Sequence, residues 1–178
     1  MTRALIAKQR VQVFKPALDN RYSSTAIASH AGRTLEAIAI ANVEDISILL
    51  HQETDVVAID EGQFLSQELV HYSMELADSG KRVIIAGLDQ DFRAEPFGPI
   101  PELMARAESV QKFTAICAQC GQAATRTQRL VNNSPAHFND PVILVGASES
   151  YEPRCRSCHK VPRGERVLSL ANHELTVG

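Results

Sequence analysis

Four cysteines in two close pairs are the residues of this chain whose spacing points most directly to chemistry. The pairs follow the pattern C-x-x-C at residues 117–120 and 155–158. Four thiolates from two such pairs surround a zinc ion tetrahedrally, and a site filled by protein ligands is structural because no position stays open for a substrate. We therefore predict structural zinc bound by Cys117, Cys120, Cys155 and Cys158. The alternatives are a redox pair, buried free thiols, and haem attachment through C-x-x-C-H at residues 155–159.

A second group of candidate residues follows the apolar run at residues 56–59, which ends in Asp60 and Glu61. An apolar run without alternation suits a strand buried on both faces of a parallel sheet, and such sheets bind ligands at the carboxyl ends of their strands. One carboxylate there can bind Mg²⁺, and its neighbour can accept a proton from an attacking hydroxyl group. This Walker B pattern predicts a phosphate-binding site. The alternative is a pair of solvated acidic residues that merely end a strand.

Polar segments also follow two other predicted strands. Asp19 and Arg21 follow the strand at residues 11–14, and residues 87–93 follow a strand expected to be buried at residues 82–88. Three aromatic residues lie in otherwise polar stretches: Phe64, Phe92 and Phe97. A single Phe is usually part of the core, but three near one site can enclose a flat ring.

An α/β scaffold is needed to position these side chains. Short apolar runs alternate with amphipathic stretches over residues 11–88, which predicts strand–helix–strand units and a parallel sheet. Asn42 and Ser66 are expected to cap the two helices, and Gly80 is suited to end the second. Beyond residue 109 strands follow one another without helices. The predicted organisation is an α/β domain over residues 1–109, a zinc-binding β domain over residues 110–166 and a tail over residues 167–178.

Composition narrows the classes of partner. The 178 residues carry a formal net charge of −3, so the basic field of a nucleic-acid-binding protein is absent. No apolar run reaches the length of a membrane span, and residues 1–8 lack the apolar core of a secretory signal. We expect a cytoplasmic protein that binds neither nucleic acid nor membranes.

Seven segments of the chain, taken in order, resemble the zinc-containing thymidine kinases, the family of the human cytosolic enzyme. The matching segments are residues 13–16, 19–23, 58–64, 85–93, 96–98, 125–130 and 145–151. Both cysteine pairs match as well. The resemblance implies a P-loop type of parallel sheet with a small zinc-binding β domain. It also implies ATP-dependent phosphorylation of the thymidine or deoxyuridine 5′-hydroxyl group, which makes dTMP and ADP in the deoxyribonucleotide salvage that feeds DNA synthesis.

The resemblance assigns roles to individual residues. Glu61 would accept the 5′-hydroxyl proton. The ATP phosphates and Mg²⁺ would be bordered by Asp60, Glu61, Gly62, Gln63, Asp19 and Arg21. The pocket for the nucleoside would be lined by Phe64, Leu88, Phe92, Phe97, Thr127, Val142, Leu144, Gly146 and Tyr151. Residues 142–151 would form the lasso loop that closes over the base, with the zinc site anchoring its two ends. The family also implies a homotetramer and feedback by thymidine triphosphate.

The chain departs from the family pattern in one respect. The phosphate-binding motif G-x-x-x-x-G-K-[ST] is not found in the 178 residues, and the match places Met1 inside the family's first helix. We therefore expect the first strand and the phosphate loop to be missing and kinase activity to be impaired. A start codon assigned too far downstream is favoured over a fragment or a truncated paralogue. The alternative functions are a zinc-stabilised nucleoside-binding or regulatory paralogue, an ATPase, and a zinc-ribbon nucleic-acid binder.

Overall fold

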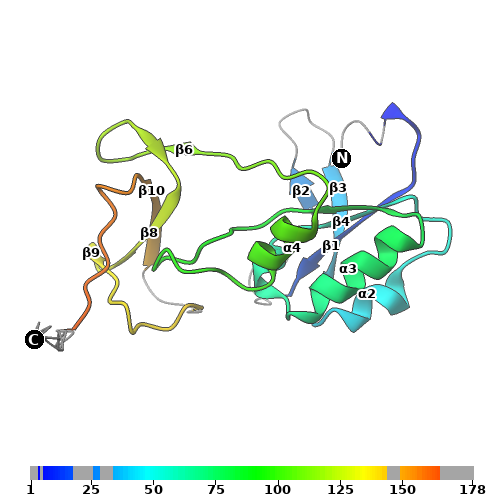
Figure 1. Cartoon of the computed structure of the whole chain (residues 1–178), viewed down its shortest axis with the longest axis horizontal. Coiled ribbons are helices and arrows are strands. Elements are labelled where there is room, and N and C mark those ends of the chain that lie inside the picture. Colours follow the sequence, from blue (N-terminus) through cyan, green and yellow to red (C-terminus); the bar gives the residue numbers. More distant parts are fainter. Residues whose placement is uncertain (1–3, 5, 18–25, 29–33, 144–148, 165–178) are drawn as a thin grey trace, which may run out of the picture. The chain divides into compact units, whose positions relative to one another are not determined.

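The computed structural model contains two compact units, Met1–Phe113 (unit 1) and Thr114–Gly178 (unit 2), which are described separately below (Figure 1). The structure describes residues 4, 6–17, 26–28, 34–143 and 149–164. Several predicted site residues lie outside these ranges, together with the predicted tail: Asp19, Arg21, Leu144 and Gly146. Among the helices of the described ranges, none combines the length and the apolar character that a membrane crossing requires.

Unit 1 is built on a five-stranded sheet in the order β2-β3-β1-β4-β5. Its strands are β1 (Val11–Pro16), β2 (Ala26–Ala28), β3 (Thr34–Ile40), β4 (Val56–Ile59) and β5 (Arg82–Ile85). Strands β3, β1, β4 and β5 are parallel, and β2 adds to β3 in the antiparallel direction. This arrangement confirms the predicted α/β class with a parallel sheet.

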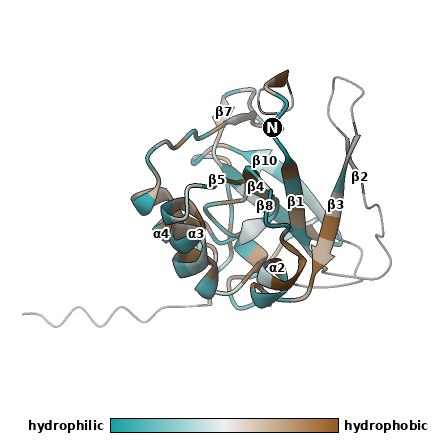
Figure 2. Ribbon diagram, turned by 90° about the vertical axis from the view of Figure 1, so that its right-hand side faces the viewer, coloured by the Kyte–Doolittle hydropathy of each residue, from teal (hydrophilic) through white to brown (hydrophobic). Residues whose placement is uncertain are grey.

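Three helices cover one face of this sheet (Figure 1). They are α2 (Glu44–Leu49), α3 (Glu68–Asp78) and α4 (Ile100–Arg106). Leu69 of α3 and Ile46 of α2 are fully buried in one cluster with Phe14 of β1. Side chains alternate between faces along a strand, so Val13 belongs to a smaller cluster on the opposite face, with Ala58 of β4. Figure 2 shows the mostly apolar β3 and β4 and the mixed apolar and polar character of α3.

The signals for helix ends were correct at two of three positions. Asn42 Oδ1 accepts a hydrogen bond from Asp45 N at 3.1 Å, as a capping residue does. Gly80 follows α3 with a φ of +87°, a left-handed conformation that glycine adopts without steric cost. The prediction for Ser66 was wrong. Its hydroxyl group donates to the Glu68 carboxylate at 3.0 Å, and no side chain caps the backbone at the start of α3.

The prediction of a buried strand at residues 82–88 was also wrong in part. Strand β5 ends at Ile85, and its side chains are half-buried or exposed. In the described sheet β5 pairs only with β4, so it lies at an edge and has a neighbour on one side. The residues after it lead into the site described below.

Unit 2 consists of two small antiparallel sheets, with strand orders β10-β8-β9 and β6-β7. The strands are β6 (Ala115–Ile116), β7 (Ala123–Ala124), β8 (Arg126–Val131), β9 (Ser134–Pro135) and β10 (Glu149–Arg154). Asn132 and Asn133, between β8 and β9, both have positive φ, which is typical of a two-residue hairpin turn. Gln128 is buried, and its amide group binds both backbone groups of Lys160, each at 2.8 Å. The amide thereby ties the segment beyond Cys158 to β8.

Candidate functional site

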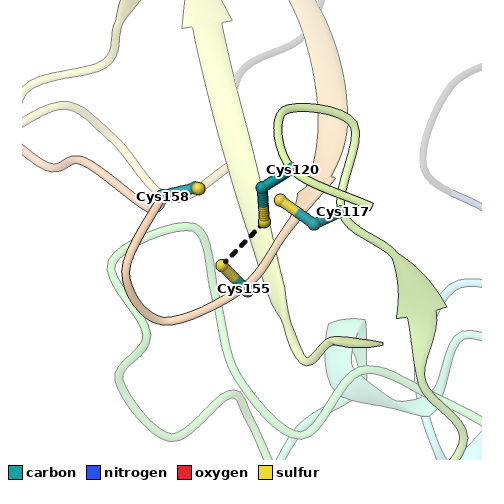
Figure 3. Close-up of side chains that lie close together, drawn as sticks. All are labelled: Cys117, Cys120, Cys155 and Cys158. Atoms are coloured by element: carbon teal, nitrogen blue, oxygen red, sulfur yellow. Dashed lines mark hydrogen bonds between the residues drawn. The ribbon is translucent and has the colours of Figure 1, made fainter. Parts of the chain in front are cut away.

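The four cysteines of unit 2 meet in one cluster (Figure 3). Their Sγ atoms all lie within 4.8 Å of one another, and the Sγ atoms of Cys120 and Cys155 are 3.6 Å apart. A tetrahedral ZnS₄ site with bonds of about 2.3 Å has sulfur atoms about 3.8 Å apart. The cluster therefore has the donor set and nearly the dimensions of a closed four-thiolate zinc site.

Two tight turns bring these thiols together. In the first, Gly121 has a φ of +74° and its N–H donates to the Cys117 carbonyl at 2.9 Å. In the second, the backbone N–H groups of Cys158 and His159 both donate to the Cys155 carbonyl. Each turn folds one C-x-x-C pair back on itself, so that both of its thiols point toward the other pair (Figure 3).

The thiols differ in how readily they ionise. Burial raises the pKa of the Cys117 thiol, but backbone hydrogen bonds, above all from Cys155, together lower it to about 6. The side chains of Cys155 and Cys120 raise the pKa of the Cys158 thiol to about 12. Without a cation the four thiols together therefore carry fewer than four negative charges, because thiolates in contact repel one another. A divalent cation removes that repulsion, so the chemistry of the cluster fits a bound metal ion.

In unit 1 the two predicted carboxylates follow β4 directly. The backbone N–H of Asp60 donates to the carbonyl of Phe14 on β1, and the Asp60 side chain accepts the Glu61 N–H at 3.0 Å. Glu61 then turns away from the sheet in a left-handed conformation, with a φ of +53°. The sharp turn leaves its side chain exposed at the carboxyl end of the parallel strands, where ligands of such sheets bind.

Gln63 connects this turn to the segment after β5. Gln63 is only 2% exposed. Its side-chain nitrogen donates to Glu61 Oε2 at 2.5 Å, and its side-chain oxygen accepts the Leu88 N–H at 3.1 Å. The end of β4 and the end of β5 are therefore joined by one buried amide group.

Aromatic rings lie next to this amide. The rings of Phe64 and Phe97 meet edge to face, with their centroids 5.3 Å apart. Leu88 is 46% exposed, whereas Phe92 is buried with the Arg93 guanidinium 5.7 Å from the centroid of its ring. Unit 1 thus brings together Glu61, Gln63, Phe64, Leu88 and Phe97, through hydrogen bonds, a ring contact or neighbouring positions in the chain. Phe92 belongs to the same loop but faces the interior.

Asp91 shapes the loop that carries these aromatic residues. Asp91 is 3% exposed, and its carboxylate accepts three hydrogen bonds, from the backbone N–H groups of Arg93 and Glu95 and from the Arg93 guanidinium. The Phe97 N–H also donates to the Asp89 carbonyl at 3.1 Å. Residues 89–97 are therefore a compact loop organised around one buried carboxylate.

In unit 2 three of the predicted nucleoside-lining residues are described. Thr127 and Tyr151 lie on the paired strands β8 and β10, and Tyr151 is 54% exposed. Val142 is half-buried and follows Pro141, whose carbonyl accepts the Arg129 guanidinium at 2.5 Å. Arg129, at 1% exposure, is one of the most buried side chains of the chain.

Sequence reasoning missed the contributions of Asp91 and Arg129. A charged residue inside a strand or next to a buried aromatic residue is the available signal, because a buried charge requires partners. The signal identifies the residue but not its partners, which come from backbone groups elsewhere in the fold.

The family model described as thymidine kinase matches residues 1–159. A thymidine kinase of Deinococcus deserti is 61% identical over 173 residues, which cover 92% of this chain and 86% of the relative. A thymidine kinase of Deinococcus radiodurans is 57% identical over 174 residues, which cover 92% of this chain and 82% of the relative.

Proposed function

The chain belongs to the thymidine kinase family, and from this premise we propose that it transfers the γ-phosphoryl group of ATP to the 5′-hydroxyl group of thymidine. The observation that supports this most is the carboxyl end of β4, where Glu61 is exposed and joined through Gln63 to Leu88. Phe64 directly follows Gln63 in the chain, and its ring packs edge to face against that of Phe97. A carboxylate base beside aromatic side chains suits a substrate with one reactive hydroxyl group and a flat ring.

In the proposed reaction Glu61 accepts the proton of the 5′-hydroxyl group, while the oxygen of that hydroxyl group forms a bond to the γ-phosphorus of ATP. The bond between that phosphorus and the bridging oxygen breaks, and ADP leaves with the electron pair. Asp60 would hold Mg²⁺, which when bound neutralises charge on the phosphates. Gly62 and the segment containing Asp19 and Arg21 are assigned to the phosphate side by the family resemblance.

We propose a structural role for zinc in unit 2. The four-thiolate cluster leaves no ligand position for a substrate. The ion would join the turn before β7 to the turn after β10, and β10 carries Tyr151. Zinc would in this way stabilise the strand pair that carries Thr127 and Tyr151, without taking part in the reaction.

Of the proposed active site, the part that binds the phosphates of ATP has the fewest of its expected residues among these 178. They contain no G-x-x-x-x-G-K-[ST] motif, whose backbone N–H groups and lysine hold the phosphates of ATP in P-loop enzymes. We propose that a polypeptide of these residues alone binds thymidine, binds MgATP weakly and turns over slowly. The alternative function, a nucleoside-binding module without catalysis, rests on the same observation.

Two polypeptides test these proposals: the 178 residues alone, and the same residues preceded by a strand and a G-x-x-x-x-G-K-[ST] loop. We expect calorimetry to detect thymidine binding in both and MgATP binding mainly in the extended form. We expect dTMP formation, followed by chromatography, to be fast only in the extended form. Glu61→Gln should remove at least about 99% of that turnover, whereas Glu75→Gln, on the exposed side of α3, should leave it unchanged.

Three results would overturn parts of this proposal. Equal turnover by the two polypeptides contradicts the need for the added loop. Thymidine binding without any dTMP formation by the extended form favours the nucleoside-binding module. No thymidine binding by either form contradicts the proposed substrate. Assembly into a homotetramer and feedback by thymidine triphosphate belong to the same proposal, and light scattering and inhibition assays test them.

A further inference from the structure

The amide group of Gln63 has a single orientation. Its oxygen accepts the Leu88 N–H at 3.1 Å, and a backbone N–H can only donate. The amide nitrogen must therefore be the atom that faces Glu61, where it donates to Oε2 at 2.5 Å. Reversing the amide would put two donors together at Leu88 and two acceptors together at Glu61, so the fold allows one arrangement.

The residues around Gln63 are packed closely against it. Two glycines face it, and a side chain on either would collide with it. A Cβ atom on Gly87 would lie 2.6 Å from the Gln63 side-chain oxygen, and a Cβ atom on Gly98 would lie 2.3 Å from its backbone oxygen. With 2% of its surface exposed, Gln63 is tightly packed, whereas its partner Glu61 is exposed.

Glu61 needs the support of Gln63, because little else constrains it. It is exposed and stands on a left-handed turn, and its side chain has several rotatable bonds. A base acts only when it is within hydrogen-bond reach of the proton that it accepts. The carboxylate has two oxygens, and the amide occupies Oε2. Among the described residues no hydrogen bond occupies Oε1, which leaves that oxygen to accept a proton.

We propose that Gln63 is a positioning residue that holds the Glu61 carboxylate against the 5′-hydroxyl group of the nucleoside, rather than a residue that contacts the phosphates of ATP. This inference rests on the proposed function. Gln63 thereby contributes, through Glu61, to the recognition of the one hydroxyl group that reacts. The bond to Leu88 couples that recognition to the segment that follows β5.

The test measures equilibrium binding and so does not depend on ATP. Calorimetry compares thymidine with 5′-deoxythymidine, which differs only by lacking the 5′-hydroxyl group. For the 178-residue protein we expect thymidine to bind about tenfold or more tightly, since a hydrogen bond to a charged group is lost in the analogue. In Gln63→Met and in Glu61→Ala we expect the two ligands to bind within about twofold of each other. Combining both substitutions should change that ratio no further.

Two more variants separate positioning from packing. Gln63→Glu keeps the volume and an oxygen for the Leu88 N–H, but it replaces the donor facing Glu61 by a second carboxylate. We expect it to lose the preference for thymidine as well. Gln67→Met is the matched control, since Gln67 donates to the Glu102 carboxylate at the same 2.5 Å on an exposed surface. We expect it to keep the preference. Far-ultraviolet circular dichroism verifies that each variant is folded.

Several outcomes would overturn the inference. If Gln63→Met and Gln63→Glu weaken both ligands equally and keep their ratio, Gln63 is a packing residue only. If the unchanged protein binds thymidine and 5′-deoxythymidine equally, Glu61 does not meet the 5′-hydroxyl group and Gln63 has nothing to position. Neither result removes thymidine as a ligand, whereas a failure to bind thymidine at all contradicts the proposed function itself.

Discussion

Gly98 gives the sharpest test of the packing around the site. Its φ is +52°, and a Cβ atom there would lie 2.3 Å from the backbone oxygen of Gln63 and 3.0 Å from its carbonyl carbon. All of these are backbone atoms, so no side-chain rotation relieves the collision. Gly98→Ala should therefore carry two costs: about 1–2 kcal/mol for the left-handed conformation and about 1–3 kcal/mol for overpacking. We expect a loss of unfolding free energy of about 2–5 kcal/mol.

Gly80 provides the matched control for this prediction. Its φ is +87°, yet no atom lies within 4 Å of a Cβ atom built on it. Gly80→Ala should therefore show the conformational cost alone. Urea unfolding followed by circular dichroism at 222 nm, where α-helices give the main signal, measures both variants. The α-helices α2, α3 and α4 of the described residues all lie in unit 1, as do both glycines. If Gly98→Ala loses no more stability than Gly80→Ala, the backbone of Gln63 yields and the steric reasoning is wrong.

Three further predictions concern the cysteine cluster, the acid limit of stability and the aromatic loop. Cys120→Ser should weaken zinc binding at least tenfold in a chelator competition, since it replaces a thiolate ligand by a neutral hydroxyl group; unchanged zinc affinity contradicts the four-thiolate site. A hydrogen bond from the Arg10 backbone N–H is the main cause that lowers the pKa of Asp55. Its stabilising contribution is present above the ordinary carboxyl pKa and is lost as the pH falls through the lowered value. Asp55→Asn should therefore flatten the fall in urea midpoint between about pH 5 and pH 3, and an unchanged slope refutes this origin. Asp91→Ala should weaken thymidine binding about tenfold or more, because it removes the buried acceptor that organises residues 89–97; calorimetry checks this, and unchanged affinity shows that the loop keeps its shape unaided.

Local patterns in the sequence predicted the parts of the molecule that depend on local physics. The C-x-x-C spacing predicted that the thiols of each pair lie together, because a turn of four residues brings its two ends together, whereas the approach of Cys120 to Cys155, 35 residues further along, depends on the fold of unit 2. The apolar run at residues 56–59 predicted a fully buried strand, and β4 is buried at every position. Asn42 and Gly80 marked helix ends through preferences of a single residue for a backbone conformation.

Other features could not be predicted locally. The half-buried state of β5 follows from its place in the strand order. The sequence does not reveal that place, because an apolar run has the same pattern in an edge strand and in a central strand. Ser66 has the side chain of a capping residue, but the carboxylate of Glu68 lies close enough to take its hydrogen bond. The apolar run does form a strand, and Ser66 does form a local hydrogen bond. The strand order determines how far the strand is buried, and the position of Glu68 determines the partner of the Ser66 hydroxyl group.

The sequence by itself determined that this chain has two C-x-x-C pairs suited to a metal ion, a strand that ends in two carboxylates, and membership of the thymidine kinase family. Only the tertiary structure decided what fixes the Gln63 amide that binds one of those carboxylates. Gln63 is 25 residues away from Leu88 along the chain, and the two meet because β4 and β5 lie in register side by side. Residue preferences act over a few positions, whereas such a contact exists only once the parallel sheet has formed.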